Sequence, residues 1–298
     1  MSRRGPLPES LRGVPFSVED ARELGVQPGR LRAGDLGVPF RGVRILAASP
    51  GSTVELCNAY LPVMQHGQLF SHLTAARLYG IPLPRRLEQG DELDVWAGYI
   101  QAKSAGVIGH RSARLPSRLV DGLPVVDPAH VFVQLATSLG RDDLIVVGDF
   151  LVRRKSPLST LDELVDVVRR SKGVRGIRQL RLALADVRPG TDSPMETRLR
   201  LVLIRAGLPE PVIGHTITDS AGGFVGTPDL CYVAERIAIE YEGDVHRTDS
   251  RVFAEDIERR ELMQEEDWYV IRVIADHVSR HPAWLVDRVR RQLRLRSP

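Results

Sequence analysis

The chain has 298 residues, which is enough for two or three domains, and 43% of them are hydrophobic and 27% charged. This is the composition of an ordinary folded globular protein, and it excludes a disordered one. The formal net charge is +3, and the sequence pI is near 9.1. These values exclude a polycation that binds nucleic acid over its whole surface, so any such binding must come from local basic patches.

The two cysteines, Cys57 and Cys231, lie in apolar stretches and lack the paired spacing of a zinc site or a disulfide framework. We expect both in the core of a protein from a reducing compartment. No run of about 18 apolar residues occurs, and residues 1–9 lack the apolar stretch of a signal peptide. The sequence therefore predicts a cytoplasmic protein that does not enter a membrane.

The N-terminal 60 residues have the signals of a small module with helices and a hairpin. Residues 17–25 are typical of a short capped helix that ends at a glycine, and residues 28–32 begin with proline as a second helix can. Residues 40–46 alternate in hydropathy around a basic tip, as in the wing of a winged helix-turn-helix. We predict a winged-helix-like module over residues 1–60.

The middle of the chain, residues 61–188, predicts a small α/β region followed by a helical linker. Apolar stretches bounded by turn signals predict strands, and longer periodic stretches predict helices. The expected strands cover residues 93–97, 106–110 and 123–126, and the expected helices cover residues 71–80, 128–137, 142–153, 160–170 and 174–186. The turn-forming residues 188–193 mark the boundary to a last domain, residues 189–298.

The last domain begins with a strong helix signal, because Ser193 can cap a helix in which Glu196 completes the capping box. The helix should end near residue 206. The segments that follow predict, in order, strands, a hairpin, a helix, a strand and a terminal helix, at residues 212–218, 224–226, 229–242, 251–266, 268–274 and 284–295. This gives the order α-β-β-β-α-β, and the whole chain is predicted to be a mixed α/β (α+β) protein.

The hairpin is the most informative segment because it carries three acids. A turn at residues 234–235 pairs Asp229 with Glu240, and side-chain alternation puts Glu240 and Glu242 on one face. Like charges opposite each other destabilise a sheet unless a proton or a cation offsets them. Carboxylates suit hard divalent ions such as Mg²⁺ or Mn²⁺. The alternative is a charged outer face that protects a sheet edge.

Five ordered motifs in residues 190–296 carry a resemblance to a known family. They are Ser193–Glu196, the Pro228-Asp229 step, Ile239–Gly243 with His246, Asp256–Arg260, and Trp268–Val273. Together they resemble an uncharacterised domain family related to the very-short-patch mismatch-repair endonucleases, which belong to the PD-(D/E)XK nuclease superfamily. The resemblance implies a restriction-endonuclease-like fold with a central mixed sheet. It also implies a metal, Mg²⁺ or Mn²⁺, on Asp229 and Glu240, with help from Glu196.

The sequence departs from this superfamily at one position. Glu242 stands where a lysine is common, so a different group would have to transfer protons or stabilise the transition state. His246, Arg259 and Arg260 are the candidates for that role. The predicted catalytic set is therefore Glu196, Asp229 and Glu240, which the resemblance implies, together with Glu242 and His246. For Glu196 helix capping alone is an alternative, and for Arg259 and Arg260 a solvated helix face is one.

A second resemblance covers roughly residues 14–155. Its motifs are Phe16–Ala21, Arg41–Val43, Ser71–Ala76 and Val126–Pro128, and they are similar to the AbiEi-type antitoxins of abortive-infection toxin–antitoxin systems. That family implies an N-terminal winged helix that binds DNA. With this resemblance, phosphate contacts would fall on the basic residues Arg30, Arg32, Arg41 and Arg44, although each of these could be an ordinary surface charge. In the last domain, Arg259 and Arg260 are separate candidates for contacts with nucleic acid.

The sequence leaves three functions open. The first is a magnesium-dependent endonuclease that hydrolyses phosphodiesters and gains DNA affinity from its N-terminal module. The second is a non-catalytic DNA-binding regulator, or antitoxin-like protein, built on a degenerate nuclease fold. The third is a module that binds another protein through the middle region. The expected partners are nucleic acid, above all DNA, and either a toxin or a second copy of the chain.

Overall fold

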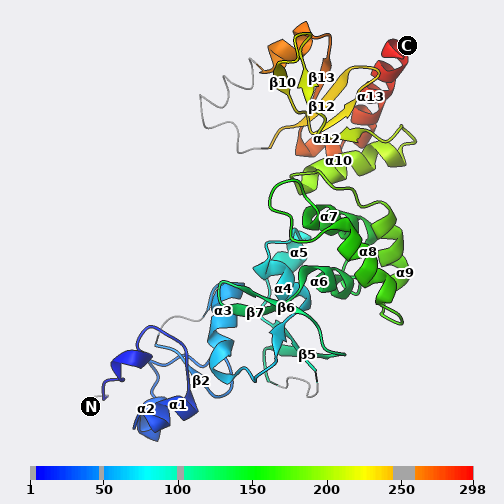
Figure 1. Cartoon of the computed structure of the whole chain (residues 1–298). Helices are drawn as coiled ribbons and strands as arrows, with labels where there is room; N and C mark the ends of the chain where they lie inside the picture. The colour runs from blue at the N-terminus through cyan, green and yellow to red at the C-terminus, as the bar shows by residue number, and fades with distance from the viewer. Residues whose placement is uncertain (1–4, 47–49, 99–103, 244–258, 298) are drawn as a thin grey trace. The chain divides into compact units, whose positions relative to one another are not determined.

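The computed structural model describes residues 5–46, 50–98, 104–243 and 259–297 (Figure 1). It confirms a mixed α/β protein with helices and several sheets. The chain divides into two compact units: unit 1 holds residues 1–143 and 163–180, and unit 2 holds residues 144–162 and 181–298. Within the described ranges, none of the helices combines the length and the apolar character that crossing a bilayer requires.

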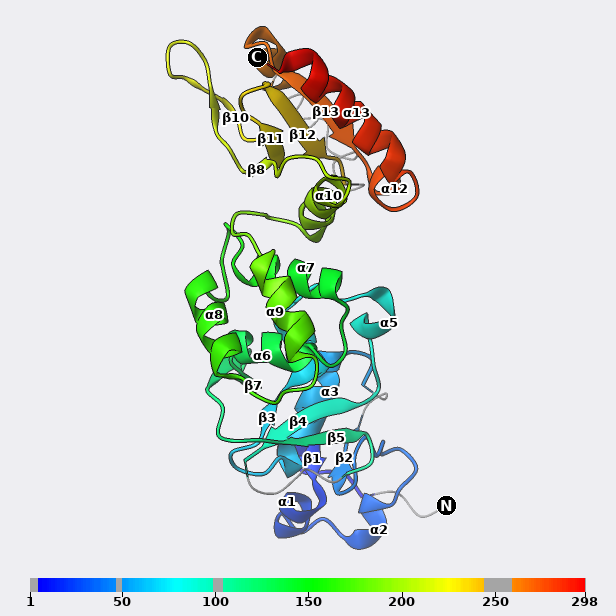
Figure 2. The ribbon, with the colours of Figure 1, turned by 90° about the vertical axis from the view of Figure 1, so that its right-hand side faces the viewer.

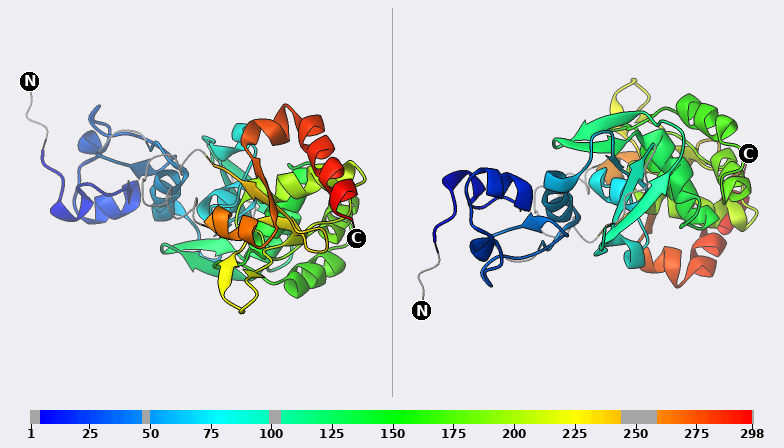
Figure 3. Two further views of the ribbon diagram at one scale, coloured as in Figure 1. Left: turned by 90° about the horizontal axis from the view of Figure 1, so that it is seen from above. Right: turned by 90° about the horizontal axis from the view of Figure 1, so that it is seen from below.

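The first 46 residues of unit 1 form two short helices and a strand pair. The elements are η1 (Glu9–Leu11), β1 (Phe16–Ser17), α1 (Val18–Glu23), α2 (Pro28–Leu31) and β2 (Val43–Arg44). Both helices agree with the sequence prediction, and the Ser17 hydroxyl caps α1 by accepting from the Asp20 N–H at 2.9 Å. A core of their own holds these elements together (blue in Figure 3), made by Leu7, Leu11, Phe16, Ala21, Val26, Leu31 and Leu36.

The predicted wing is only partly a strand. β2 pairs antiparallel with β1, which precedes the helices. An antiparallel bridge between Gly37 and Ile45 closes a hairpin whose tip carries the exposed Arg41. The turn places Gly42 at a φ of +85°, a backbone conformation that favours glycine. The basic tip of the expected wing is therefore present on a shorter hairpin than predicted.

A five-stranded sheet is the centre of unit 1, in the order β5-β4-β3-β7-β6. β3 is parallel to β7 and β4 is parallel to β5, whereas the β3–β4 and β6–β7 pairs are antiparallel. The strands are β3 (Leu69–Phe70), β4 (Leu93–Ala97), β5 (Val107–Arg111), β6 (Ser117–Val120) and β7 (Leu123–Val126). β4, β5 and β7 were predicted within one residue. β3 and β6 were missed, because β3 is two residues long and β6 is largely exposed.

Helices cover this sheet and lead into unit 2. They are α3 (Thr53–Tyr60), η2 (Leu61–Val63), α4 (His72–Leu78), α5 (Arg85–Glu88), α6 (Pro128–Leu135), α7 (Arg141–Leu151), α8 (Leu161–Arg170) and α9 (Ile177–Ala185). Capping explains where several begin: Ser52 caps α3, and Asp127 caps α6 with proline in the first turn. The predicted helices of this region are all present, with ends shifted by up to three residues.

Unit 2 contains a four-stranded mixed sheet in the order β13-β12-β11-β8, with β12 parallel to β13 and the other pairs antiparallel (Figure 2). β9 and β10 form a separate two-stranded sheet. Residues 259–265 are helical. The other elements are α10 (Pro194–Arg205), β8 (Val212–Ile213), β9 (Ile217–Thr218), β10 (Phe224–Gly226), β11 (Leu230–Tyr232), β12 (Ile237–Tyr241), β13 (Tyr269–Val273), α12 (Ala275–Ser279) and α13 (Pro282–Arg296).

The predicted register of the acidic hairpin is confirmed, because Leu230 pairs with Ile239 and Tyr232 pairs with Ile237. The single strand expected at residues 212–218 is wrong. It splits into β8 and β9 at Gly214, whose φ is +59° and whose N–H donates to the Asp229 carbonyl at 3.2 Å. α12 was missed as well, since its five residues are too few to show a helical period.

The two faces of this sheet bury different residues. Leu230, Tyr232, Ile237 and Ile239 belong to a core that includes α10 and α13 residues. The alternate positions Cys231 and Ala238 belong to a second core with Met263 and Trp268, which follow residue 258. Because side chains alternate along a strand, Glu240 lies on the second face with Ala238.

A buried ion pair fixes α10. The Arg200 guanidinium and the Asp149 carboxylate are both fully buried, and Arg200 Nη2 donates to Asp149 Oδ2 at 2.9 Å. The same nitrogen donates to the Asp186 carbonyl at 2.8 Å, and Nη1 donates to Glu210 Oε1 at 3.1 Å. The Thr197 hydroxyl also donates to Asp149 Oδ2. These bonds tie the first turns of α10 to the C-terminal half of α7.

Replacing Arg200 with methionine should therefore destabilise unit 2 strongly. Asp149 would be left buried without its charge partner, which costs about 3–5 kcal/mol of unfolding free energy. Denaturant unfolding measures the change. Arg205→Met, at an exposed position of the same helix, is the matched control and should cost less than about 1 kcal/mol. Equal losses in the two variants would contradict the assigned role.

Candidate functional site

Three carboxylates of unit 2 come from three separate elements. Glu196 is in the first turn of α10, Asp229 directly precedes β11, and Glu240 is the fourth residue of β12. Asp229 and Glu240 lie on the sheet face that is covered by Met263, one of the helical residues 259–265. The predicted hairpin register positions Asp229 and Glu240, and the predicted helix cap positions Glu196.

Local hydrogen bonds orient two of the three carboxylates. Asp229 Oδ2 accepts from the Tyr241 N–H at 2.6 Å, across the hairpin. Glu196 Oε2 accepts from the Asp192 N–H at 2.8 Å, and the Glu196 N–H donates to Ser193 Oγ at 3.2 Å. Glu196 thus reaches one residue further back than the capping box predicts. Its side chain closes the helix start and remains close to the other acids.

The charges of the other two acids act on Asp229. Its pKa is raised to about 7 in all, mainly by burial and then by the charges of Glu196 and Glu240, against lowering by the Tyr241 N–H and Arg259. Burial also raises the pKa of Glu196. Asp229 is therefore poised to hold a proton near neutral pH. A proton or a cation relieves such a cluster, and groups of this kind concentrate at functional sites.

Guanidinium groups contact both strand glutamates. Glu240, which is 7% exposed, forms an ion pair with Arg259, whose Nη2 lies 3.1 Å from Oε1. Glu242 forms an ion pair with Arg272 of β13. Arg259, for which the sequence suggested a nucleic-acid contact, thus lies beside a proposed metal ligand. Arg260 is half-buried, and His246 is outside the described residues.

A carboxylate-only donor set suits Mg²⁺ or Mn²⁺. In the described part of the chain, however, the group of three potential metal ligands whose ligand atoms all lie within 4.8 Å of one another is His72, Asp94 and His110. This group lies in unit 1. An ion at Asp229 and Glu240 would have to draw the acids closer and take over contacts that Arg259 makes.

Sequence analysis missed the group in unit 1. The His110 Nε2 atom lies 2.7 Å from Asp94 Oδ1. The His72 and His110 rings stack, with centroids 3.6 Å apart and an interplanar angle of 19°. The pKa of His72 is lowered to about 4, mainly by burial and then by His110, against raising by Asp94, so this ring is neutral at pH 7. No local motif joins positions 72, 94 and 110. The available signal was an acid inside the otherwise apolar β4.

The four N-terminal arginines that the resemblance places on DNA divide into two kinds. Arg30 donates to both Asp35 carboxylate oxygens at 2.9 Å and to the Gly5 carbonyl at 2.8 Å. Arg44 donates to the Leu31 and Val43 carbonyls, each at 2.7 Å. Arg32 and Arg41 are exposed. A phosphate contact is therefore easier for Arg32 and Arg41, since Arg30 and Arg44 hold the module together.

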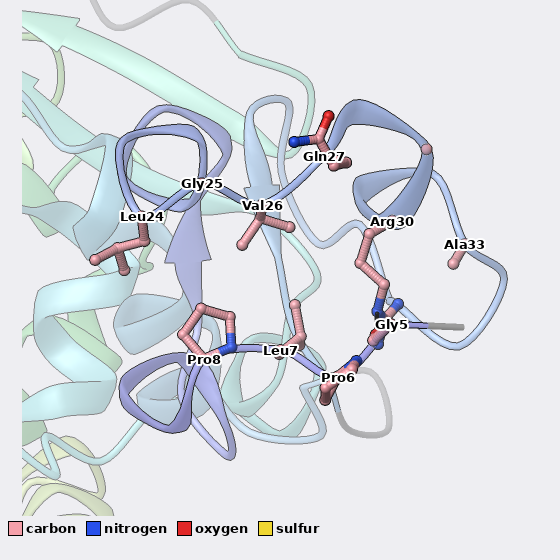
Figure 4. Close-up of a pocket in the computed structure, with 11 residues that line it drawn as sticks. Gly5, Pro6, Leu7, Pro8, Leu24, Gly25, Val26, Gln27, Arg30 and Ala33 are labelled. Carbon is pink, nitrogen blue, oxygen red and sulfur yellow. Dashed lines mark hydrogen bonds between the residues drawn. The ribbon is translucent and has the colours of Figure 1, made fainter. Parts of the chain in front are cut away.

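A hollow of about 680 Å³ opens beside α2 in the same module (Figure 4). Apart from Arg30, which already bonds Asp35, its lining side chains carry no titratable group. It lies in unit 1, whereas the carboxylates lie in unit 2. The lining residues are Gly5, Pro6, Leu7, Pro8, Leu24, Gly25, Val26, Gln27, Gly29, Arg30 and Ala33. This set offers no catalytic chemistry.

Comparison with known proteins gives matches to curated relatives and to a solved structure. The chain is 29% identical over 236 residues to uncharacterized protein MT2308 of Mycobacterium tuberculosis (strain CDC 1551 / Oshkosh), across 79% of this chain and 85% of the relative. Uncharacterized protein Rv2248 of strain ATCC 25618 / H37Rv gives the same values. The crystal structure of RV2827C protein from Mycobacterium tuberculosis matches with a TM-score of 0.40 and 17% identity, covering 69% of this chain and 84% of that one. No family model matches.

The raised pKa of Asp229 predicts a pH-dependent effect of Asp229→Asn on stability. The folded protein holds a proton up to about pH 7, whereas an unfolded aspartate releases it near pH 4, so the contribution of this carboxyl to stability falls as the pH rises from about 4 to about 7. Asparagine does not titrate, so the variant does not lose this stability as the pH rises. At pH 8 the variant should be more stable than the wild type by on the order of 2 kcal/mol, and at pH 4 the gain should vanish.

Denaturant unfolding at the two pH values measures this difference. Asp219→Asn, which removes an acid from the β9–β10 turn, is the control and should show no gain at pH 8. A wild type that is more stable than Asp229→Asn at both pH values would contradict the proposed repulsion among the acids.

Proposed function

We propose that the protein is a Mg²⁺- or Mn²⁺-dependent endonuclease of the PD-(D/E)XK type that hydrolyses phosphodiester bonds in nucleic acid. The observation that carries the proposal is the convergence of Glu196, Asp229 and Glu240 from three elements, with the pKa of Asp229 raised to about 7 by burial and by the other two charges. A divalent ion would relieve such a cluster, and its binding would release the proton that Asp229 holds.

The arrangement of unit 2 supports this proposal. α10 precedes the sheet, β8, β11 and β12 pair antiparallel, and β13 joins parallel to β12 after the helical residues 259–265. This order agrees with the α-β-β-β-α-β fold and the central mixed sheet that the family resemblance implies. Asp229 and Glu240 lie at the hairpin positions where the resemblance puts the metal.

In this mechanism Asp229 and Glu240 would hold the ion, and Asp229 would lose its proton as the ion binds. A divalent ion supplies two effects when bound: it stabilises charge on the phosphate and it lowers the pKa of water. Glu196 would accept a hydrogen bond from the attacking water and orient it toward the phosphorus atom. Glu196 can do so with the oxygen that does not accept from the Asp192 N–H.

Arg259 would take the part that a lysine has in many nucleases of this type. Glu242 occupies the lysine position and is paired with Arg272, whereas the Arg259 guanidinium already contacts Glu240 at 3.1 Å. If an ion bound Glu240, the Arg259 guanidinium would lie beside the ion and would turn toward the phosphate. A guanidinium at that place stabilises the negative charge that builds up in the transition state.

A second function is favoured by the same ion pairs. Arg259 offsets Glu240 and Arg272 offsets Glu242, so the strand glutamates are satisfied without any ion. In that case the nuclease fold would serve a non-catalytic DNA-binding regulator or antitoxin-like protein. The N-terminal module would supply DNA affinity in both cases, through Arg32 and Arg41 at its surface, and a toxin would be a further partner only in the second.

Cleavage of supercoiled plasmid, single-stranded DNA and RNA with Mg²⁺ or Mn²⁺ tests the first function. The wild type should cut at least one of these substrates. Asp229→Asn should slow cutting at least about 100-fold, because the metal contributes several kcal/mol to the transition state. Glu235→Gln, which removes an acid from the turn of the same hairpin, should keep the wild-type rate. Equal rates for all three proteins would indicate a contaminant and end the nuclease proposal.

The salt dependence of DNA binding tests the N-terminal module. Replacing Arg32 and Arg41 together with alanine should reduce the slope of log affinity against log salt by about 2, since each lost phosphate contact lowers it by about 0.9. Fluorescence anisotropy with duplex DNA at several salt concentrations measures the slope. Arg85 and Arg86, two exposed arginines of α5, form the control pair. If replacing Arg32 and Arg41 reduces the slope no more than replacing Arg85 and Arg86 does, the assignment of DNA contacts to the N-terminal module is contradicted.

A further inference from the structure

The His72, Asp94 and His110 group lies in unit 1 and is separate from the carboxylates of unit 2. Asp94 and His110 belong to the parallel neighbours β4 and β5, where Asp94 is in register with Ile108 and Trp96 with His110. Because alternate residues of a strand share a face, Asp94 and His110 project from the same side of the sheet. α4, which begins with His72, packs on β4.

We propose that His72, Asp94 and His110 bind one zinc ion. Two imidazoles and one carboxylate are one of the donor sets of three-ligand zinc sites, which leave a fourth position for water or a substrate. The nitrogen donors disfavour Mg²⁺ and Ca²⁺, which prefer oxygen ligands. The proposal does not depend on the nuclease function, because it uses other residues in another unit.

The close packing of the three side chains supports the site. Their ligand atoms all lie within 4.8 Å of one another, and zinc with ligands at about 2.0–2.2 Å requires separations somewhat smaller than that. Asp94 is 7% exposed, and the side chain of His110 is 27% exposed. An acid and two histidines therefore meet at a place that is shielded but still reachable from solvent.

Neighbouring polar groups hold the ligands in place. The buried Ser71 hydroxyl lies 3.0 Å from His72 Nδ1, and ligating histidines commonly use one nitrogen in such a bond, which fixes the ring and its tautomer. The Gln134 side chain accepts from the His72 N–H at 2.9 Å, and the Thr74 hydroxyl accepts from the Asp94 N–H at 2.8 Å. These three bonds come from α4 and α6 and orient both His72 and Asp94.

The backbone of His72, one of the three proposed ligands, has an unusual conformation. Its φ is +47°, a left-handed conformation that non-glycine residues seldom adopt because it costs free energy. Such residues concentrate at ligand sites, where the surrounding contacts hold them. The Gln134 contact holds this one.

Zinc binding requires a small rearrangement of the rings. The two imidazoles now stack, so at least one must tilt before the planes of both rings meet at one ion. The bond between His110 Nε2 and Asp94 Oδ1 must also open, with the His110 proton moving to Nδ1 so that Nε2 can bind. Both changes are rotations or tautomer shifts of side chains and leave the sheet intact.

Calorimetric titration of zinc into full-length, metal-free protein tests the proposal, with the apo fold of each variant checked by circular dichroism. The wild type should bind one zinc that His110→Ala and the nearly isosteric Asp94→Asn each weaken at least about 100-fold. Ser71→Ala, which removes only the outer hydrogen bond, should weaken it by about 10-fold. His66→Ala, at an exposed histidine of the same unit, should leave it unchanged, as should Asp229→Asn.

X-ray absorption on the zinc-loaded wild type gives a readout that needs no variant. It should show two imidazoles, with zinc–nitrogen distances of about 2.0–2.1 Å. The proposal is overturned if the absorption spectrum lacks imidazole scattering, or if the wild type binds zinc no more tightly than His110→Ala and Asp94→Asn. Zinc that is lost only in Asp229→Asn would belong to the carboxylates of unit 2 and would overturn it equally.

Discussion

The buried ion pair between Arg200 and Asp149 is the interaction on which the candidate nuclease site depends. Both side chains are fully excluded from water, and burying charges costs free energy unless each finds a partner in good geometry. Arg200 lies one turn after Glu196 on α10, so the bonds that fix Arg200 against α7 also fix the acid that α10 brings to Asp229. An apolar residue would fill the same space, but it would not set the position of the helix through directed hydrogen bonds. The Arg200–Asp149 pair therefore sets the position of α10, and with it the position of Glu196 relative to Asp229.

The charges around Asp229 distinguish the two functions that we consider, a nuclease and a non-catalytic regulator. Burial, with the charges of Glu196 and Glu240, raises the pKa of Asp229 to about 7. Two cations can relieve the repulsion: a divalent metal, or the Arg259 guanidinium that already contacts Glu240. In a nuclease, the metal must displace Arg259 from Glu240 so that the guanidinium can turn toward the phosphate. In a regulator, the ion pair between Arg259 and Glu240 would remain. Glu242 is paired with Arg272, whereas Arg259 contacts Glu240 and lowers the pKa of Asp229, so the position of Arg259 decides between the two functions.

Local signals explain what could be predicted from the sequence, and distant contacts explain the rest. The hairpin register followed from strand alternation about a short turn, and the start of α10 followed from the Ser193 cap and its proline. Neither depends on the rest of the fold. The Arg200 pair joins residues 51 positions apart, and the Asp94–His110 contact depends on the register of two parallel strands. No periodicity reports such pairings, which is why the group in unit 1 and the partners of Glu240 and Glu242 were missed. The exposed β6 was missed because its burial pattern carries almost no apolar signal.

The binding of a divalent ion between Asp229 and Glu240 is the central claim, and anomalous diffraction from crystals soaked in Mn²⁺ tests it most directly. The account predicts a manganese peak within coordinating distance of both carboxylates, about 2.0–2.6 Å, with the Arg259 guanidinium moved away from Glu240. A map at millimolar Mn²⁺ that shows no peak there, with Arg259 still paired to Glu240, would contradict it.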